Sequence, residues 1–498
     1  MIEGLSARQP LTARGQDGPR RWRIIVPIAV GLVLALLPSP AGLAPFAWRY
    51  LALFVATILA LITEPFPPAS IGLIAVTIGG AFGLVFSPLQ RAAPSFNLPA
   101  EGLKWALSGF INSTIWLIFG AFVFAMGYER TGLGRRIALV LVERLGGRTL
   151  GLGYAIAIAD LVLAPFTPSN TARSGGTIFP IINRIPDLYG SAPGESSRRI
   201  GSYLMWVAFS TTCVTSSMFV TALAPNLFAI ELARKAAGID LTWTDWLREF
   251  LPIGLPLFAA LPWLVYRIYP PEIRTSAEVP RWAAQELANL GPITIKEVMM
   301  ASLVVAALAL WIAGGSFVDP AMVALAAISL MVLFSVISWD DIVGNRTGWN
   351  VLVTFATLLT MAEGLSRTGV IDWVGRAVSA VLAGHGPLAV LAILVALFFL
   401  LHYMFASVTA HATALLPAML AAGMAVPGMP VRPFVMLMVF SLGLMGVLTP
   451  YATGPAPVYF GSGFIPRRDF WRLGLIFGVI FLVALLGLGL PSLLLVNH

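Results

Sequence analysis

Long apolar runs alternate with short polar segments along almost the whole chain. An α-helix needs about 20 apolar residues to cross the roughly 30 Å hydrocarbon core of a bilayer. Eleven runs come close to that length and predict membrane spans at about residues 24–38, 48–64, 69–87, 114–128, 200–220, 250–268, 298–314, 320–337, 349–363, 431–448 and 472–492. The pattern predicts an all-α polytopic membrane protein.

Two further apolar segments, 151–183 and 387–423, are interrupted by the polar clusters "FTPSNTARSGG" and "FASVTAHATA". The first arm, residues 151–166, would extend about 24 Å at 1.5 Å per residue, which is too short to span. We therefore expect a re-entrant hairpin at 151–183. The second arm is borderline in length, and we expect a hairpin at 387–423 mainly because it corresponds to the first.

Composition agrees with a membrane protein, since 58% of the 498 residues are hydrophobic and only 11% are charged. The single Cys213 excludes a disulfide framework, and no cysteine and histidine cluster has the spacing of a zinc or haem site. We expect no metal and no cofactor. The net charge of +8 comes from basic residues in short loops, as the positive-inside rule predicts, so no nucleic-acid partner is expected.

The arginines also orient the chain. Residues 1–23 carry five arginines, and the run that follows is interpreted as a span because no small-residue cleavage site follows it. With this tail in the cytoplasm, the basic loops at 130–148, 184–199, 274–296 and 467–472 fall there too. The C-terminus is then expected on the outer, periplasmic side of a bacterial inner membrane.

An internal repeat is the most informative pattern. Three matches recur in the same order and at nearly constant spacing: the motif "RTG" at 130–132 and 367–369, the polar clusters that begin at Ser169 and Ser407, and the prolines of "TALAPN" and "YATGPA", Pro225 and Pro455. Each copy holds five crossings and a hairpin that returns to its own side. The two copies are therefore expected to be inverted repeats.

Four helix breaks are expected in repeat-related positions, at 167–172, 221–225, 405–410 and 448–455. Broken helices persist at membrane depth only where they line a cavity, and the helix N-termini that follow a break suit an anion. Neutral side-chain donors at these breaks are Ser169, Asn170, Thr171, Ser407, Thr409, Thr221 and Thr453. Simple packing kinks are the alternative for any one break.

Arg173 and His411 each lie four residues past the start of their cluster. An arginine at bilayer depth costs roughly 2.5–3.5 kcal/mol, so it must face protein or a wet cavity. A structural ion pair with Asp160 is the alternative for Arg173, and a hydrogen-bonded core residue is the alternative for His411. Their repeat symmetry favours a shared role, whereas His402 is interpreted as packing.

The segments "TPSNTARSGGTIFPI" (167–181), "HYMFASVTAHATALLP" (402–417) and "YATGPAPVYFGSGF" (451–464) together resemble the divalent anion/sodium symporter family. The likeness is closest to its bacterial citrate/succinate and 2-oxoglutarate/malate antiporter branch. It implies a homodimer in which a fixed scaffold holds a transport domain that carries substrate by an elevator motion.

The resemblance also implies a substrate site. The first Ser-Asn-Thr motif falls on Ser169, Asn170 and Thr171, whereas the second departs from the family pattern and has no amide at Val408. The remaining implied contacts are Ser407, Thr409, Thr453, Gly454 and Pro455.

Arg173 and His411 stand where sodium-coupled members carry small neutral residues, so their charges would take the places of the sodium ions. An empty site would leave these charges unpaired and slow the return of the empty domain, which points to antiport.

The internal repeat and the family resemblance together predict four kinds of segment: a tail, a linker, a scaffold and a transport domain. The expected parts are the tail 1–23, scaffold 24–150 and 298–385, the cytoplasmic linker 269–297, and transport domain 151–268 (hairpin 151–183, interrupted span 200–235) and 386–498 (hairpin 387–423, interrupted span 431–462).

The predicted function is secondary active exchange of di- or tricarboxylate anions of the malate, succinate, 2-oxoglutarate and citrate class. A sodium- or proton-coupled dicarboxylate symporter is the alternative. An intramembrane enzyme with His411 as base is disfavoured, because no HExxH motif or paired catalytic aspartates occur in the spans.

Overall fold

The computed structural model describes residues 21–314, 317–382 and 384–496. Within these ranges the regular structure is helical apart from one isolated bridge between Arg148 and Thr275, so the predicted all-α class is confirmed. Most of the predicted tail 1–23 lies outside the described residues.

The described residues form the helices α1 to α24 along the chain. In the first half they are α1 (Arg21–Leu36), α2 (Pro45–Thr63), α3 (Pro68–Ala81), α4 (Pro88–Arg91), α5 (Leu98–Ala106), α6 (Ser113–Thr131), α7 (Leu133–Leu145), α8 (Thr149–Leu163), α9 (Phe179–Ile182), α10 (Gly201–Met218), α11 (Ala224–Ala237) and α12 (Trp243–Ile268). In the second half they are α13 (Glu278–Leu290), α14 (Ile295–Ala313), α15 (Pro320–Leu333), α16 (Trp339–Gly344), α17 (Arg346–Arg367), α18 (Val370–Leu382), α19 (Pro387–Leu401), α20 (Val408–Met424), α21 (Val431–Leu444), α22 (Ala456–Gly461), α23 (Arg467–Ala484) and α24 (Leu490–Val496).

The repeated "RTG" motif marks equivalent helix ends. Gly132 follows α6 with φ of 76°, and Gly369 follows α17 with φ of 78°. This left-handed conformation turns the chain sharply out of a helix, and glycine adopts it without the steric cost that a Cβ would bring. The motif therefore places α7 and α18 in corresponding positions after a long helix.

Among the described residues, six helices are long and apolar enough to cross a membrane. They are Pro45–Thr63, Thr149–Phe166, Trp243–Ile268, Ile295–Ala313, Pro387–Met404 and Arg467–Leu495. Four coincide with predicted spans, but two are the first arms of the predicted hairpins. The expectation that the first arm is too short to span is therefore wrong, because the helix begins at Thr149, two residues before the expected start, and has 18 residues up to Phe166. The hairpins, and the number of spans, stay predictions.

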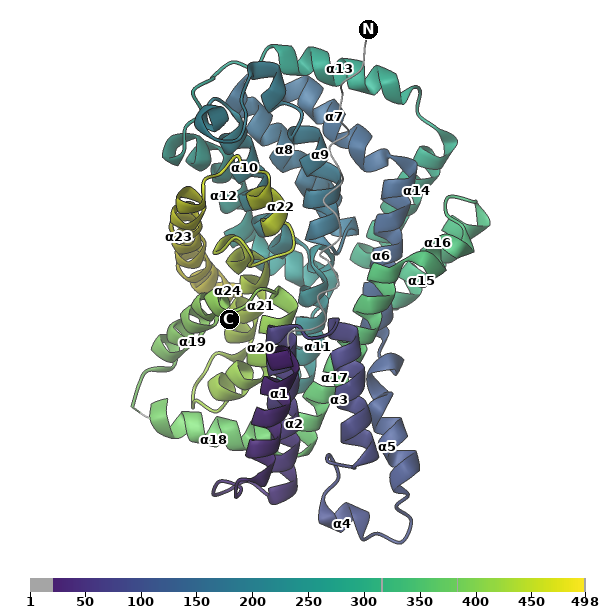
Figure 1. Ribbon diagram of the computed structural model, residues 1–498, viewed down its shortest axis with the longest axis vertical. Helices are drawn as coiled ribbons and strands as arrows, with labels where there is room; N and C mark the ends of the chain where they lie inside the picture. The colour runs from purple at the N-terminus through teal and green to yellow at the C-terminus, as the bar shows by residue number, and fades with distance from the viewer. Residues whose placement is uncertain (1–20, 315–316, 383, 497–498) are drawn as a thin grey trace.

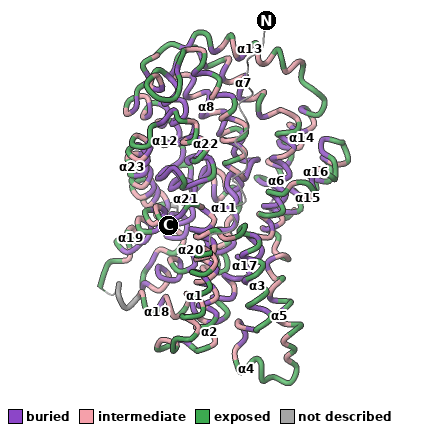
Figure 2. Tube along the Cα trace, in the orientation of Figure 1, coloured by how far each residue is buried: buried purple, intermediate pink, exposed green. Residues whose placement is uncertain are grey.

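Helices α10 and α21, which the predicted repeat matches to each other, pack together, and nearly all of their residues are buried. Buried segments surround α21 in the interior of the molecule (Figure 2). Every residue of α10 is buried, although the helix is rich in hydroxyl groups. A helix that is buried on all sides lies inside a bundle, where its polar groups need partners. The Ser210 hydroxyl, for example, donates to the Trp206 carbonyl oxygen at 2.6 Å. Other α10 hydroxyl groups, those of Thr212 and Ser216, accept hydrogen bonds from Arg173.

The linker helix α13 lies across one end of the molecule and packs on α7, while α1, α2, α3 and α5 extend toward the other end (Figure 1). Two ion pairs attach the linker region to α7, Arg135 to Glu286 and Arg136 to Glu297, each with an N to O distance of 2.6 Å. The Arg136 and Glu297 side chains are mostly buried. The linker is therefore a packed part of the structure.

Candidate substrate site

The first polar cluster is a sharp break between two helices. After α8 the chain passes through a 3-10 turn (Ala164–Phe166) and resumes as a π-helix, Thr171–Ile178. Pro165 and Pro168 stop α8, because proline has no N–H to donate and its ring clashes with a preceding turn. The Ser169 hydroxyl oxygen accepts a hydrogen bond from the Ala172 N–H at 3.2 Å and so caps the new helix. We call residues 167–172 the first tip.

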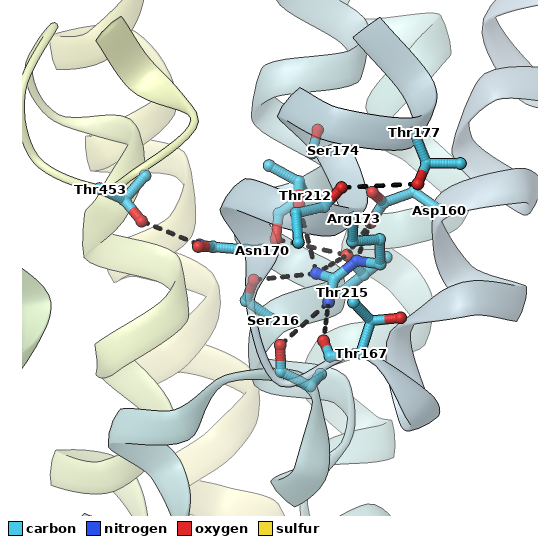
Figure 3. A network of polar contacts seen from close by, with 12 residues as sticks. Asp160, Thr167, Asn170, Arg173, Ser174, Thr177, Thr212, Thr215, Ser216 and Thr453 are labelled. Carbon is cyan, nitrogen blue, oxygen red and sulfur yellow. Dashed lines mark hydrogen bonds and ion pairs between the residues drawn. The ribbon is translucent and has the colours of Figure 1, made fainter. Parts of the chain in front are cut away.

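The first tip touches the helix break that follows α21 in the other repeat. The Asn170 amide nitrogen donates to the Thr453 hydroxyl oxygen at 2.8 Å, across 283 residues of chain (Figure 3). Beside this bond, a Cβ on Gly454 would lie 1.7 Å from the Thr171 hydroxyl oxygen, so only glycine fits. Asn170 and Thr453 are buried, whereas Thr171 and Gly454 are exposed. A predicted donor set from both repeats therefore meets at one accessible point.

A cavity of 490 Å³ opens beside the first tip. Its lining includes Ser169 of the tip, Arg130 at the end of α6 and Asp341 of α16. The Arg130 and Asp341 side chains form an ion pair at the wall. Hydrogen bonds from the Ser338 backbone and hydroxyl, together with the Arg130 charge, lower the pKa of the Asp341 carboxyl. This wall is therefore charged at neutral pH.

A second cavity, of 740 Å³, is lined by α7, α13 and the arm that follows the first tip. Glu129 lines both cavities, and Arg135 and Arg184 line the larger one. Both volumes lie in the range of small-molecule sites.

The second polar cluster, residues 405–410, has the same cap but lacks the amide, and we call it the second tip. The Ser407 hydroxyl oxygen accepts from the Ala410 N–H at 3.3 Å, and Ser407 and Thr409 are partly exposed. Val408, at the position of Asn170, is buried. Among the described residues, no hydrogen bond joins Ser407 or Thr409 to the first tip, whereas Asn170 and Thr171 contact Thr453 and Gly454.

Thr221 is engaged elsewhere. Its hydroxyl donates to the Pro165 carbonyl oxygen at 2.6 Å and accepts from the Trp243 indole N–H at 3.2 Å. The residue is 1% exposed. In this conformation its only proton is therefore committed to holding the first break together, and it has none for an anion. Pro455, also predicted at the site, is buried and precedes α22.

Arg173 lies behind the first tip and is completely buried. Its Nε is 3.2 Å from a carboxylate oxygen of Asp160 in α8, and its Nη1 donates to the carbonyl oxygens of Thr167 and Ala222, both at 2.9 Å (Figure 3). An ion pair with Asp160 is the alternative role that the sequence leaves open for Arg173, and the structure contains this ion pair. Arg173 is therefore not the unpaired cation that was expected.

Hydroxyl groups of α10 complete the surroundings of the guanidinium. Its Nη2 lies 3.3 Å from the Thr212 hydroxyl, 3.4 Å from the Thr215 hydroxyl and 3.1 Å from the Ser216 hydroxyl. The Thr215 hydroxyl also donates to Asp160. These three residues were not among the predicted site residues, although the hydroxyl-rich stretch "STTCVTSS" in an otherwise apolar run is a usable signal.

His411 has a different environment in the second hairpin. Its ring is fully buried, with centroid distances of 4.3 Å to Phe398 and 4.9 Å to both Phe405 and His402. Neither ring nitrogen has a hydrogen-bond partner among the described residues. Phe398 stands in the second repeat where Asp160 stands in the first, at the same offset as the two polar clusters, so His411 lacks the carboxylate that Arg173 has.

Apolar helices that break in repeat-related positions around buried polar groups, beside cavities of small-molecule size, define a polytopic membrane transporter. The sequence model described as "Sodium:sulfate symporter transmembrane region" matches residues 19–496. The chain belongs to this family, and the predicted membership of the divalent anion/sodium symporters is confirmed.

Relatives and a solved structure agree with this assignment. The proteins named "L-tartrate/succinate antiporter" from Shigella sonnei and from Escherichia coli strain K12 are each 49% identical to the chain over 472 residues, covering 94% of this chain and 97% of the relative. The Alcanivorax borkumensis YdaH transporter, whose structure is described as having an unusual topology, superposes with a TM-score of 0.56 at 14% identity, covering 86% of this chain and 98% of that one. That likeness concerns the fold alone.

Proposed function

We propose that the chain exchanges dicarboxylate anions of the tartrate and succinate class across the bacterial inner membrane, binding a substrate carboxylate at the first tip. The observation that carries the proposal is the accessible contact between the tip and the second repeat, where Asn170 and Thr171 meet Thr453 and Gly454. Relatives at 49% identity with the antiporter name support the substrate class.

Neutral donors suit this task. A charge-assisted hydrogen bond contributes roughly 1.5–3 kcal/mol, and a helix N-terminus adds favourable N–H groups, so a few donors hold a carboxylate without a fixed positive charge. The partly exposed hydroxyls of Ser169 and Thr171 supply such donors at the first tip. Ser407 and Thr409 supply the corresponding hydroxyls for the second carboxylate when the tips come together around a substrate.

Arg173 accounts for exchange without sodium. Carbonyl and hydroxyl oxygens are the groups that coordinate hard metal cations, and here the guanidinium fills that environment between Thr167 and Ala222. Asp160 neutralises the Arg173 guanidinium, so this charge is not what slows the return of the domain without substrate. The barrier comes instead from the hydrogen-bond donors of the tips, which lose their water as the domain crosses and have no substrate to bond to. His411 occupies the corresponding place in the second repeat.

We further propose the elevator arrangement, with residues 151–268 and 386–498 as the moving domain, in a homodimer with the N-terminus in the cytoplasm and the C-terminus outside. Re-entrant hairpins and inverted repeats are part of this proposal. The ion pair between Lys235 of α11 and Glu363 of α17, at 3.4 Å, then joins moving and fixed parts and must break during transport.

The test is uptake of labelled succinate into proteoliposomes, with and without internal dicarboxylate and with and without sodium. We expect uptake only into vesicles loaded with succinate, tartrate or a similar dicarboxylate, at a rate that sodium does not change. Sodium-driven net uptake into empty vesicles would instead establish the symporter. Competition by tartrate, malate, 2-oxoglutarate and citrate then ranks the substrates.

A further inference from the structure

Two backbone carbonyl groups occupy equivalent places at the helix breaks of the two repeats. Ala222 precedes Pro225 by three residues, and Ala452 precedes Pro455 by three residues. The Ala222 oxygen accepts a hydrogen bond from Arg173 at 2.9 Å. The Ala452 oxygen lies 2.8 Å from Nε2 of His402. The two breaks are thus each held by a cationic or imidazole side chain of the preceding hairpin.

The side chain that bonds to this carbonyl comes from a different arm of the predicted hairpin in each half of the chain. Arg173 lies on the arm after the tip, whereas His402 lies at the end of the arm before the tip, in the 3-10 turn His402–Met404. His411, at the sequence position of Arg173, makes no hydrogen bond among the described residues. A carbonyl oxygen only accepts, so Nε2 of His402 carries the proton and donates it to Ala452.

The segment that His402 holds is the one on which the first tip rests. Thr453, the residue after Ala452, accepts the Asn170 amide at 2.8 Å, and Gly454 lies against the Thr171 hydroxyl. A shift of the Ala452 carbonyl would therefore move both partners of the tip.

We infer that His402 is a positioning residue that fixes the donor geometry of the substrate site through its Nε2–H. The inference rests on the proposed function of that site.

Packing alone does not account for an imidazole here. His402 is fully buried at the end of an apolar helix, "LVALFFLLHYM", where leucine or phenylalanine would fill the space without a polar group. A buried polar group lowers stability unless it is hydrogen-bonded. The hydrogen bond that His402 makes reaches a residue 50 positions away in the other break of the same repeat, which is the contact that a positioning role needs.

The experiment compares His402→Gln, His402→Asn and His402→Leu in succinate exchange. The glutamine amide reaches the place of Nε2, the asparagine amide reaches only the place of Nδ1, and leucine fills the volume without a donor. We expect the KM of the asparagine and leucine variants to rise about 10- to 100-fold, with a smaller change in kcat, because the buried carbonyl loses its donor. The glutamine variant should stay within about threefold of the parent protein. The exposed His385→Leu serves as control.

A second readout does not depend on transport. In a Cys213→Ser background, Tyr451→Cys reports the mobility of the segment, because Tyr451 is exposed and adjoins Ala452. Its labelling by a thiol reagent should speed up with His402→Asn and stay unchanged with His402→Gln.

Equal KM and equal labelling in the glutamine and asparagine variants would overturn the inference. Absence of exchange in the parent protein would instead reject the proposed function, and the labelling comparison would still decide the role of His402.

Discussion

The buried pair of Arg173 and Asp160 allows the electrostatics of the site to be tested by a double-mutant cycle. The single variants are Arg173→Gln and Asp160→Asn, and the double variant combines them. Both side chains are at most 1% exposed, so solvent screening does not weaken the pair. Removing one partner of a buried pair costs about 3–5 kcal/mol because the other charge is left uncompensated.

The double variant should recover much of that loss, because glutamine and asparagine leave no charge behind. Each single substitution should lower the apparent Tm in detergent by about 5–10 °C, and the double variant by clearly less than the sum of the two. Exchange should stay low in both variants that carry Arg173→Gln, since glutamine does not replace the two Nη1 hydrogen bonds to Thr167 and Ala222 together with the Nη2 contacts.

The assay pairs thermal unfolding of purified protein with succinate counterflow in proteoliposomes. Additive losses of Tm in the double variant would refute the ion pair as an energetic unit. Full exchange by the double variant would refute the view that the guanidinium holds the two breaks together. An exposed control is Ser329→Ala, whose hydroxyl donates to the Leu325 carbonyl oxygen of its own helix and has no other hydrogen bond within the described part of the chain.

Three further outcomes follow from the same geometry. Asn170→Ala removes the bond to Thr453 and should raise the KM for succinate about 10- to 100-fold without loss of folded protein, measured by exchange and size-exclusion chromatography. Gly454→Ala should abolish exchange, whereas Gly461→Ala, which has open space around it, should not; equal activity of the two would contradict the close approach to Thr171. In a Cys213→Ser background, single cysteines beside the first tip should react with an impermeant thiol reagent from the cytoplasm and those beside Thr409 from outside, and labelling of both from one side alone would reject the inverted repeat.

Much of this fold is readable from the sequence because lipid imposes strong rules. Long apolar runs, the arginine loops and the repeated "RTG" motif predict the helical class and the order of helices. The pairing of Arg173 with Asp160 could be proposed from the sequence, because only 13 residues separate them across a predicted hairpin. The sequence underestimates the length of the first arm, since no pattern shows that α8 begins at Thr149, two residues before the expected start.

The contacts between repeats could not be read in the same way. The bond from Asn170 to Thr453 spans 283 residues and depends on how two breaks pack, which no local pattern encodes. The sequence favours a packing role for His402, because nothing in the pattern around a lone histidine in an apolar run identifies Ala452 as its hydrogen-bond partner.

The absence of a carboxylate partner for His411, in contrast, was within reach of the sequence. Applying the offset between the two polar clusters to Asp160 leads to Phe398, an apolar residue. The predicted repeat therefore places a buried nitrogen-containing side chain at both positions, Arg173 and His411, but provides a counter-ion only for Arg173.

A cation that is part of the polypeptide is never released on the other side of the membrane. Arg173 therefore cannot draw work from an ion gradient, as a dissociable sodium ion would. In the exchange of two anions of equal charge, the membrane potential contributes nothing either, because no net charge moves. The concentration ratio of the incoming anion across the membrane can then rise only as far as the opposing ratio of the outgoing anion permits. The direction of transport is therefore set by the concentrations of the two anions on the two sides.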